Sequence, residues 1–286
     1  MKYIGAHVSI SGGVYNAPLN AQKINARAFG MFTKNQLRWN AKEIKREDIK
    51  KFHRNLNKAG ISSQHVLVHD TYLINLANPV SEKYNKSLNA FIDGAKRVEK
   101  LGLKYFNFHP GSTLGKISDE KGLELISDAV NKTLEVTEDV VLVLETTAGQ
   151  GNDLGYKFEH LASIIKNSQD KNRMGVCIDT AHIFGAGYDI RTRKSYNGTM
   201  ENFDKVIGLK YLKGVHLNDS KVGLNSRKDR HANVGQGIFG WDVFEMLMKD
   251  ERLNDIPLIM ETKNSSRWKD DIKRLYSFVP DYKKSK

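Results

Sequence analysis

The chain has 286 residues, of which 40% are hydrophobic and 27% are charged, with 45 Lys and Arg against 33 Asp and Glu. No apolar stretch approaches the roughly 20 residues that span a bilayer, and no apolar signal segment opens the chain, so we expect a soluble, cytoplasmic protein without membrane association. Cys177 is the only cysteine, which excludes an intramolecular disulfide and a zinc site made of thiolates, and its place in an apolar run predicts inert packing.

The formal net charge of +12 indicates either an anionic partner or a highly soluble surface. A basic surface gains affinity for nucleic acid by releasing counterions from the phosphates. Alternatively, surface lysines only keep the protein soluble, and charge by itself leaves both interpretations open. The run 42–51, which Glu43, Glu47 and Asp48 interrupt, resembles a solvated helix face, and the chain ends in a basic tail at 283–286.

Eight short apolar runs have the length and composition of buried strands. In chain order they are residues 3–7, 28–32, 66–68, 105–108, 140–144, 174–178, 211–215 and 257–260. Most of the intervals are roughly 35 residues long, which accommodates a strand, a loop, a helix of three to five turns and a return loop. We therefore interpret each interval as one βα unit.

Two of the segments between the runs show the periodicity of amphipathic helices. Residues 81–101 place their apolar side chains on one face, with Ser81 predicted as the N-cap and Gly102 as the end. Residues 118–136 repeat the pattern, with Ser118 predicted as the N-cap. Both segments fit the outer layer around a parallel sheet.

Eight strand and helix units in 286 residues match a (β/α)8 TIM barrel, an α/β fold that typically has about 250 residues. The chain shows no Pro/Gly/Ser-rich linker, low-complexity tract or shift in composition, so we predict a single domain over residues 1–286. A barrel gathers the C-terminal ends of all its strands at one mouth, where such folds place their active sites.

Six of the predicted strands end in a histidine or an acidic residue, and these are His69, His109, Glu145, Asp179, His216 and Glu261. Spacings of 40, 36, 34, 37 and 45 residues would bring all six to the same mouth. A single strand-end histidine is usually a packed or hydrogen-bonded residue, but six such residues together indicate metal ligands. His182, Asp229 and His231 bring the number of candidate ligands to nine, whereas His7 either supports a ligand or packs.

The chemistry of these residues favours a catalytic metal centre. Imidazole and carboxylate without thiolate fit zinc best and manganese or iron next, and a barrel mouth leaves coordination positions open. Nine ligands suit two or three ions, and Glu145, whose two oxygens can bind separate ions, is the natural bridge. Ions about 4 Å apart can activate water and clamp a phosphorus centre, so phosphodiester hydrolysis is the leading reaction.

Long motifs surround these residues. They are 1–9 (MKYIGAHVS), 32–36 (FTKNQ), 69–76 (HDTYLINL), 107–112 (NFHPGS), 145–151 (ETTAGQG), 177–182 (CIDTAH), 185–189 (GAGYD), 216–221 (HLNDSK) and 229–231 (DRH). On these motifs the chain resembles the endonuclease IV family of apurinic/apyrimidinic endonucleases, and the resemblance runs from Met1 to beyond Glu261.

The resemblance implies a zinc-dependent repair enzyme that cleaves duplex DNA 5′ to an abasic site, leaving a 3′-hydroxyl and a 5′-deoxyribose phosphate, and that also cleans 3′ ends. A monomer is the default expectation, and we expect association with the nucleoid if the source is bacterial. Carried over by motif, one zinc ion would be held by His69, His109 and Glu145, a second by Glu145, Asp179, His216 and Glu261, and a third by His182, Asp229 and His231. Glu145 and Glu261 are the expected catalytic residues. Glu145 would bridge two ions, and Glu261 would orient or deprotonate the attacking water.

The resemblance also implies which residues contact DNA. Tyr72 and Leu73 match residues that enter the base stack and help to flip out the abasic nucleotide, although as a sequence they also fit a hydrophobic rim loop. At Leu37, relatives often carry a wedging arginine, and Arg38 is the expected substitute. At Gln236, relatives often carry glutamate, and we expect a minor effect because the position is not a ligand.

Two other functions remain alternatives. A divalent-metal sugar isomerase or epimerase with a related barrel would explain the fold and part of the site, but not Asp229 and His231, the Tyr72 loop or the basic surface. A metal-stabilised binding protein without catalysis would need closed coordination spheres.

Overall fold

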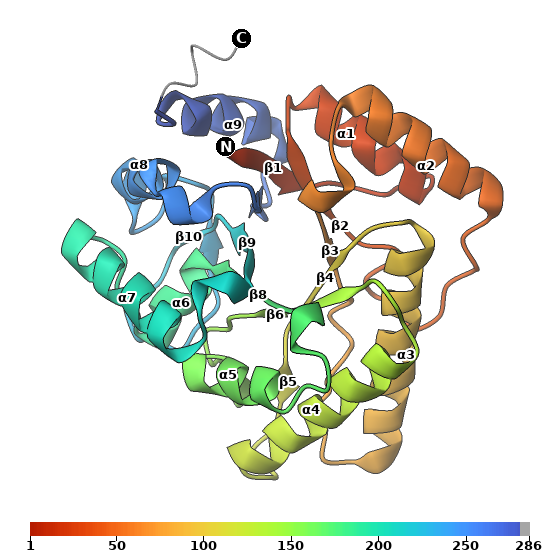
Figure 1. The fold of residues 1–286 in the computed structure, drawn as a ribbon. Helices are drawn as coiled ribbons and strands as arrows, with labels where there is room; N and C mark the ends of the chain where they lie inside the picture. Colours follow the sequence, from red (N-terminus) through yellow and green to blue (C-terminus); the bar gives the residue numbers. More distant parts are fainter. Residues whose placement is uncertain (281–286) are drawn as a thin grey trace.

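The computed structural model describes residues 1–280, so the basic tail at 283–286 lies outside the described residues. Within 1–280, eight parallel strands close into a barrel in which each strand pairs with the next one along the chain and the last pairs with the first (Figure 1), which confirms the predicted TIM barrel. The barrel strands are β1 (Tyr3–His7), β2 (Ala28–Met31), β3 (Val66–His69), β4 (Tyr105–Phe108), β6 (Val141–Glu145), β8 (Met174–Asp179), β9 (Leu212–His216) and β12 (Pro257–Met260).

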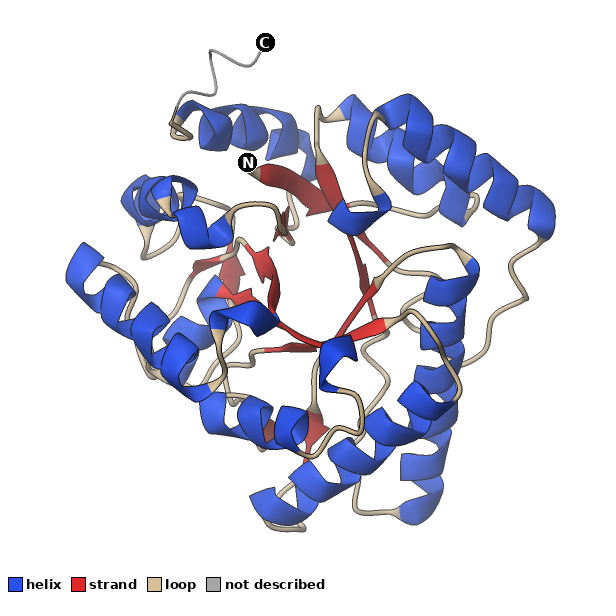
Figure 2. Cartoon of the chain, in the orientation of Figure 1, coloured by secondary structure: helices blue, strands red, loops and turns tan. Residues whose placement is uncertain are grey.

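The helices form a ring outside the strands (Figure 2). They are α1 (Ala17–Lys23), α2 (Arg46–Ala59), α3 (Ser81–Lys100), α4 (Asp119–Glu135), α5 (Phe158–Lys166), α6 (Thr180–Ala186), α7 (Arg193–Val206), α8 (Gly240–Lys249) and α9 (Trp268–Ser277). Ser118 caps α4 as predicted, because its hydroxyl accepts a hydrogen bond from the Lys121 amide at 3.2 Å. The predicted capping role of Ser81 is wrong: Val80 is the N-cap of α3 and Ser81 is its first helical residue.

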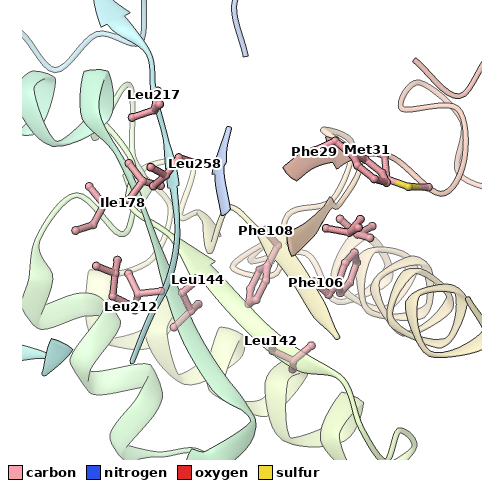
Figure 3. Packing of buried hydrophobic residues seen from close by; sticks show 14 of the residues in the cluster. Phe29, Met31, Phe106, Phe108, Leu142, Leu144, Ile178, Leu212, Leu217 and Leu258 are labelled. Carbon is pink, nitrogen blue, oxygen red and sulfur yellow. The ribbon is translucent and has the colours of Figure 1, made fainter. Parts of the chain in front are cut away.

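Side chains of the barrel strands alternate between two apolar layers, as the period of two of a strand requires. Outward-facing residues such as Phe106 and Leu142 belong to the large core between strands and helices (Figure 3), where Phe106 stacks on Phe91 of α3 at 5.2 Å. A second, smaller cluster fills the barrel interior, and it consists of Ala28, Leu67, Val141, Val143, Cys177 and Ile259. The prediction that Cys177 packs inertly agrees with its complete burial in this cluster.

This alternation sets which side chains reach the mouth. Val141 and Val143 face inward on β6, so Glu145, two residues further, is the next inward side chain at the end of the strand. Glu145 is opposite Cys177, whereas Asp179, two residues further along β8, is opposite His216. The inward residues at the strand ends therefore lie at staggered levels and together cover the top of the barrel interior.

Short antiparallel pairs in the connecting loops extend the mouth. β5 (Gly111–Ser112) pairs with β7 (Asp153–Leu154), and β10 (Asp219–Ser220) pairs with β11 (His231–Ala232), which places His231 above the barrel end. None of the helices within residues 1–280 is both long enough and apolar enough to cross a membrane.

Candidate metal centre

Eight of the nine predicted ligands lie in three groups at the barrel mouth, and within each group the ligand atoms are at most 4.8 Å apart. The groups are His69, His109 and Glu145; Glu145, Asp179, His216 and Glu261; and Asp179, His182 and His231. Two carboxylates are shared, because Glu145 belongs to the first and second groups and Asp179 to the second and third. The three groups therefore form one continuous cluster.

The two oxygens of Glu145 face different histidines. Its Oε2 lies 3.1 Å from His69 Nε2, while its Oε1 lies 2.9 Å from His216 Nδ1 and 3.5 Å from His109 Nε2. The side chain has no exposed surface. Its oxygens thus contact histidines of both the first and the second group, and a carboxylate placed between two groups in this way can bridge two ions.

The ninth predicted ligand, Asp229, lies beside the third group. Its carboxylate oxygens are 3.2 Å from His182 Nε2 and 3.1 Å from His231 Nε2, and the two imidazole nitrogens are themselves 3.3 Å apart. Asp179 approaches the same place from below, with 3.6 Å between its Oδ2 and His231 Nε2. Two imidazole nitrogens and two carboxylates thus converge on one point.

Backbone carbonyls fix the orientation of two of the imidazoles. His69 Nδ1 donates to the Asp70 carbonyl oxygen at 2.7 Å, and His182 Nδ1 donates to the Thr146 carbonyl oxygen at 2.8 Å. With the proton on Nδ1, each neutral ring directs the lone pair of Nε2 into the cluster. Metal-binding histidines in proteins are usually held in this way.

Neighbouring imidazoles favour the ionised form of Glu145 and Glu261 although both carboxylates are largely buried. Burial raises the pKa of Glu145, but the positive charges of His216 and His109 lower it well below its usual value, and His216 lowers the pKa of Glu261 in the same manner. Burial lowers the pKa of His216, but Cys177 and Glu145 raise it well above its usual value. Buried carboxylates at this density need cations beside them, either protonated imidazoles or metal ions, and the oxygen and nitrogen donor set fits divalent metal ions.

A cavity of about 500 Å³ opens over the cluster. His182, His231, Asp229 and Glu261 form part of its floor and walls, together with His69, His109 and Tyr72, and the cationic residues Lys221, Arg230 and Lys263 also line it. The cationic side chains around the cavity would attract an anionic group. Metal ions held by the carboxylates and imidazoles below would attract the same group.

The residues predicted to contact DNA lie on loops at this mouth. Tyr72 is 59% exposed and packs edge-on against Phe32 at a ring distance of 5.6 Å, whereas Leu73 is half-buried. Leu37 is 70% exposed, and Arg38 beside it is also exposed. The loop therefore presents both residues, and the aliphatic side chain of Leu37 is as available as the guanidinium of Arg38.

The loop between β2 and α2 is tied to helix α3 by two buried cationic side chains that share a partly exposed carboxylate. The ammonium of Lys34, whose side chain is 1% exposed, donates to the Asp93 carboxylate at 3.0 Å and to the Trp39 carbonyl oxygen at 3.3 Å. Arg97 donates to the same carboxylate at 2.9 Å and to the carbonyl oxygens of residues 41 and 42 at 3.0 and 2.8 Å. We call Lys34, Asp93 and Arg97 the loop clamp.

The interpretation of the sequence missed two buried amides, Asn107 and Asn218, which contact the carboxylates of the cluster. Both positions carried a signal. Asn107 precedes His109 by two residues, and Asn218 follows His216 by two residues within the HLNDSK motif. Gln236, in contrast, is exposed and accepts a hydrogen bond from Asn233 at 2.9 Å, away from the ligand groups.

Comparisons with known proteins agree with this geometry. The sequence profile of the family described as xylose isomerase-like TIM barrel matches residues 19–278. A curated protein named "Probable endonuclease 4", from Campylobacter fetus subsp. fetus (strain 82-40), is 52% identical over 279 residues, which cover 98% of this chain and 99% of that protein.

Two solved structures show how far the similarity extends. The crystal structure of endonuclease IV from Thermus thermophilus is 29% identical, with a TM-score of 0.85 over 96% of this chain and 98% of the other. A D-tagatose 3-epimerase-like protein has a TM-score of 0.74 over 98% and 99% of the two chains, but its identity of 19% shows a shared fold alone. The chain therefore belongs to the endonuclease IV family of nucleases, which is built on the xylose isomerase-like TIM barrel.

Proposed function

We propose that the protein is a zinc-dependent DNA repair endonuclease that cleaves the phosphodiester on the 5′ side of an abasic site, leaving a 3′-hydroxyl and a 5′-deoxyribose phosphate. The observation that carries the proposal is the continuous cluster at the mouth, in which Glu145 and Asp179 each belong to two ligand groups. Family membership supports the same activity.

Three ions would be held by the three groups, with Asp229 completing the third. Bound there, zinc would lower the pKa of a water molecule and stabilise negative charge at phosphorus and on the leaving oxygen. Manganese or iron could replace zinc at some positions, since the donors are imidazoles and carboxylates.

The protein's own residues supply orientation and charge. Glu145 would bridge two sites, and Glu261, which faces the cavity, would accept a proton from the attacking water or hold that water in place. Lys221, Arg230 and Lys263 would pair with the phosphates on either side of the scissile bond. Metal binding would leave little general acid or base chemistry to side chains, so this part of the protein mainly positions its substrate.

Lesion selection would depend on the exposed loop residues. Tyr72 and Leu37 expose large apolar surfaces at the mouth, and the half-buried Leu73 lies next to Tyr72 in the same loop. Inserted into the minor groove, such side chains would separate stacked bases at a cost that is lowest where a base is missing. Arg38 would contact the backbone or take the place of the usual wedge.

We further propose that residues 1–286 act as one catalytic domain and as a monomer, that the enzyme works on the chromosome in the cytoplasm, and that it also cleans blocked 3′ ends. All these activities need the same cluster. Cleavage of a 3′ block is a phosphodiester hydrolysis that differs only in the group lying beside Tyr72.

A duplex oligonucleotide with a single abasic-site analogue tests the proposal directly. The purified protein should carry close to three zinc ions per chain and nick this duplex 5′ to the analogue, leaving an undamaged duplex of the same sequence intact. An abasic duplex that stays whole after metal reconstitution would contradict the proposal.

The alternative of a sugar isomerase or epimerase is favoured only by the shared fold. Such an enzyme would equilibrate ketohexose epimers in the presence of a divalent metal and would ignore the abasic duplex. The same preparation should therefore be assayed with ketohexoses, where we expect no turnover.

A further inference from the structure

Two asparagines lie inside the metal centre although neither belongs to a ligand group. Asn107 is on β4 and Asn218 follows β9, and both side chains are completely buried, with 0% exposed surface. A buried carboxamide costs free energy unless its polar atoms find partners. The partners that these two amides do find are the carboxylates of the cluster.

Asn107 contacts the shared carboxylate of the first two groups. Its Nδ2 donates to Oε2 of Glu145, the oxygen that lies 3.1 Å from His69 Nε2. Its Oδ1 is buried and has no hydrogen-bond partner within residues 1–280. The amide is therefore held by Glu145 alone, and the reversed orientation would set two acceptor oxygens against each other.

Asn218 connects the ends of three strands. Its Nδ2 donates to Asp179 Oδ2 at 2.6 Å and lies 3.3 Å from Glu261 Oε2, while its Oδ1 accepts a hydrogen bond from the Glu261 amide at 3.0 Å. Asp179 ends β8 and Glu261 follows β12, so one side chain sets the relative position of two carboxylates from opposite sides of β9.

We propose that Asn107 and Asn218 are positioning residues that orient the metal-binding carboxylates. Asn107 restricts the rotation of Glu145 so that its carboxylate keeps contact with the histidines of both ligand groups. Asn218 holds Asp179 and Glu261 in one arrangement. An amide suits this place because it donates hydrogen bonds without adding charge, whereas an aspartate of the same shape would replace the donor with a negatively charged acceptor.

The test compares Asn107→Asp and Asn218→Asp with a matched control, Asn131→Asp on α4, whose amide donates to the Asn167 carbonyl oxygen far from the mouth. Zinc affinity is measured by competition with a chromogenic chelator. We expect both site variants to bind zinc about 10- to 100-fold more weakly, as is usual when a residue supporting a metal ligand is lost. The control should bind zinc as the wild type does.

Two further measurements separate positioning from a general structural role. Asn107→Ala and Asn218→Ala remove the donor without adding charge, and they should weaken zinc binding in the same direction but less. Activity lost at limiting zinc should return as zinc is added. Folded variants with wild-type zinc affinity would overturn the proposal, and so would a loss of folding in all four variants, which would make the amides general structural residues.

The inference rests on the metal centre of the proposed function but not on the DNA substrate. Zinc affinity reports on the asparagines even when no duplex is present. A protein that binds zinc through oriented carboxylates yet leaves abasic duplex intact would refute the proposed function and leave this inference standing.

Discussion

The ring of Tyr72 lies 5.7 Å from the ring of His69, so the loop after β3 and the metal centre share one wall of the mouth. Tyr72 is held there by Phe32, and it still exposes more than half of its surface. A group that packs against Tyr72 therefore also lies beside His69. In the proposed function, recognition of a lesion and chemistry at the cluster would therefore take place side by side in one cavity.

Leu73→Ala tests this division of roles. Loss of the half-buried leucine should loosen the Tyr72 loop and reduce the preference for abasic over undamaged duplex by about 10-fold, the effect of roughly 1.4 kcal/mol of lost apolar contact. The ratio of kcat/KM values for the two duplexes measures the preference. Zinc content should stay at the wild-type value, and a loss of zinc would contradict a role in recognition alone.

Glu145→Ala should abolish incision. Glu145 belongs to two ligand groups, so its removal disrupts two ion sites at once. We expect the zinc content to fall from about three ions to about one, and kcat to fall by more than about 100-fold, which is the upper range for loss of a residue that merely supports a ligand. Metal analysis and incision assays on the same sample check both parts. Near-normal turnover with a full metal complement would refute the bridging assignment.

Removal of the metal should destabilise the fold. His182 and His231 place two ring nitrogens 3.3 Å apart beside two carboxylates, an arrangement that a bound cation stabilises in the folded chain only. At a thousandfold excess over the dissociation constant, one ion contributes about 4 kcal/mol, so zinc should raise the midpoint of thermal unfolding by about 10 °C. Melting curves with a chelator and after zinc is restored measure the shift, and identical midpoints would argue against a stabilising metal centre.

Asp93→Asn should weaken substrate binding without slowing chemistry. The change removes the shared carboxylate of the loop clamp and frees the loop that presents Leu37 and Arg38. We expect KM for the abasic duplex to rise by about 5-fold, roughly 1 kcal/mol, with little change in kcat or zinc content. Asp128→Asn on α4 is the matched control, since that carboxylate also accepts hydrogen bonds, from Tyr84 and Lys132, but lies on a helix outside the mouth. If Asp93→Asn has the same KM as Asp128→Asn, the loop clamp has no role in substrate binding.

Lys2 should give stability a specific dependence on pH. Its side chain is buried, and burial lowers its pKa from 10.5 to about 8 despite the nearby charges of Asp250 and Asp255. Between these values the unfolded chain binds a proton that the folded chain has released, so stability rises with pH across this window. The rise is at most on the order of 3 kcal/mol.

Urea unfolding of the wild type and of Lys2→Met measures this pH-dependent contribution of Lys2 to stability. The free energy of unfolding of the wild type should increase relative to that of the variant between about pH 8 and about pH 10. A constant difference over that range would show that the lysine is charged in the folded protein. The lysine lies at the start of β1, at the opposite end of the barrel from the cluster, so metal binding does not interfere.

Much of the fold could be predicted because buried parallel strands are encoded locally. The run ending in Glu145 consists of branched and aliphatic residues, and β6 indeed covers Val141–Glu145. The order of strands followed from the barrel itself, which joins neighbours along the chain. The prediction of the N-cap of α3 was wrong at Ser81, because a serine near the start of a helix fits both the N-cap position and the first helical turn.

Two of the three ligand groups have the members expected from the family motifs, and the third contains Asp179 beside His182 and His231, with Asp229 next to it. Inward positions at strand ends follow from the period of two, so His69, His109 and Glu145 were expected to meet. The sharing of Asp179 between two groups, and the amides of Asn107 and Asn218 behind the carboxylates, depend on distances across strands that spacing does not contain. Asn107 and Asn218 each lie two residues from a predicted ligand, but that spacing alone does not separate them from the asparagines that are common in loops and turns.

The loop clamp has a consequence for how this enzyme could change its specificity. Asp93 and Arg97 lie one turn apart on α3, and α3 rests on β4 through the stacking of Phe91 on Phe106. The orientation of the β2–α2 loop thus depends on how α3 packs against β4, and so would the contact of this loop with a DNA substrate. Substitutions in the contact between α3 and β4 would change the orientation of Leu37 while every candidate metal ligand stays in place. New lesion preferences could then evolve without any change in the candidate metal centre.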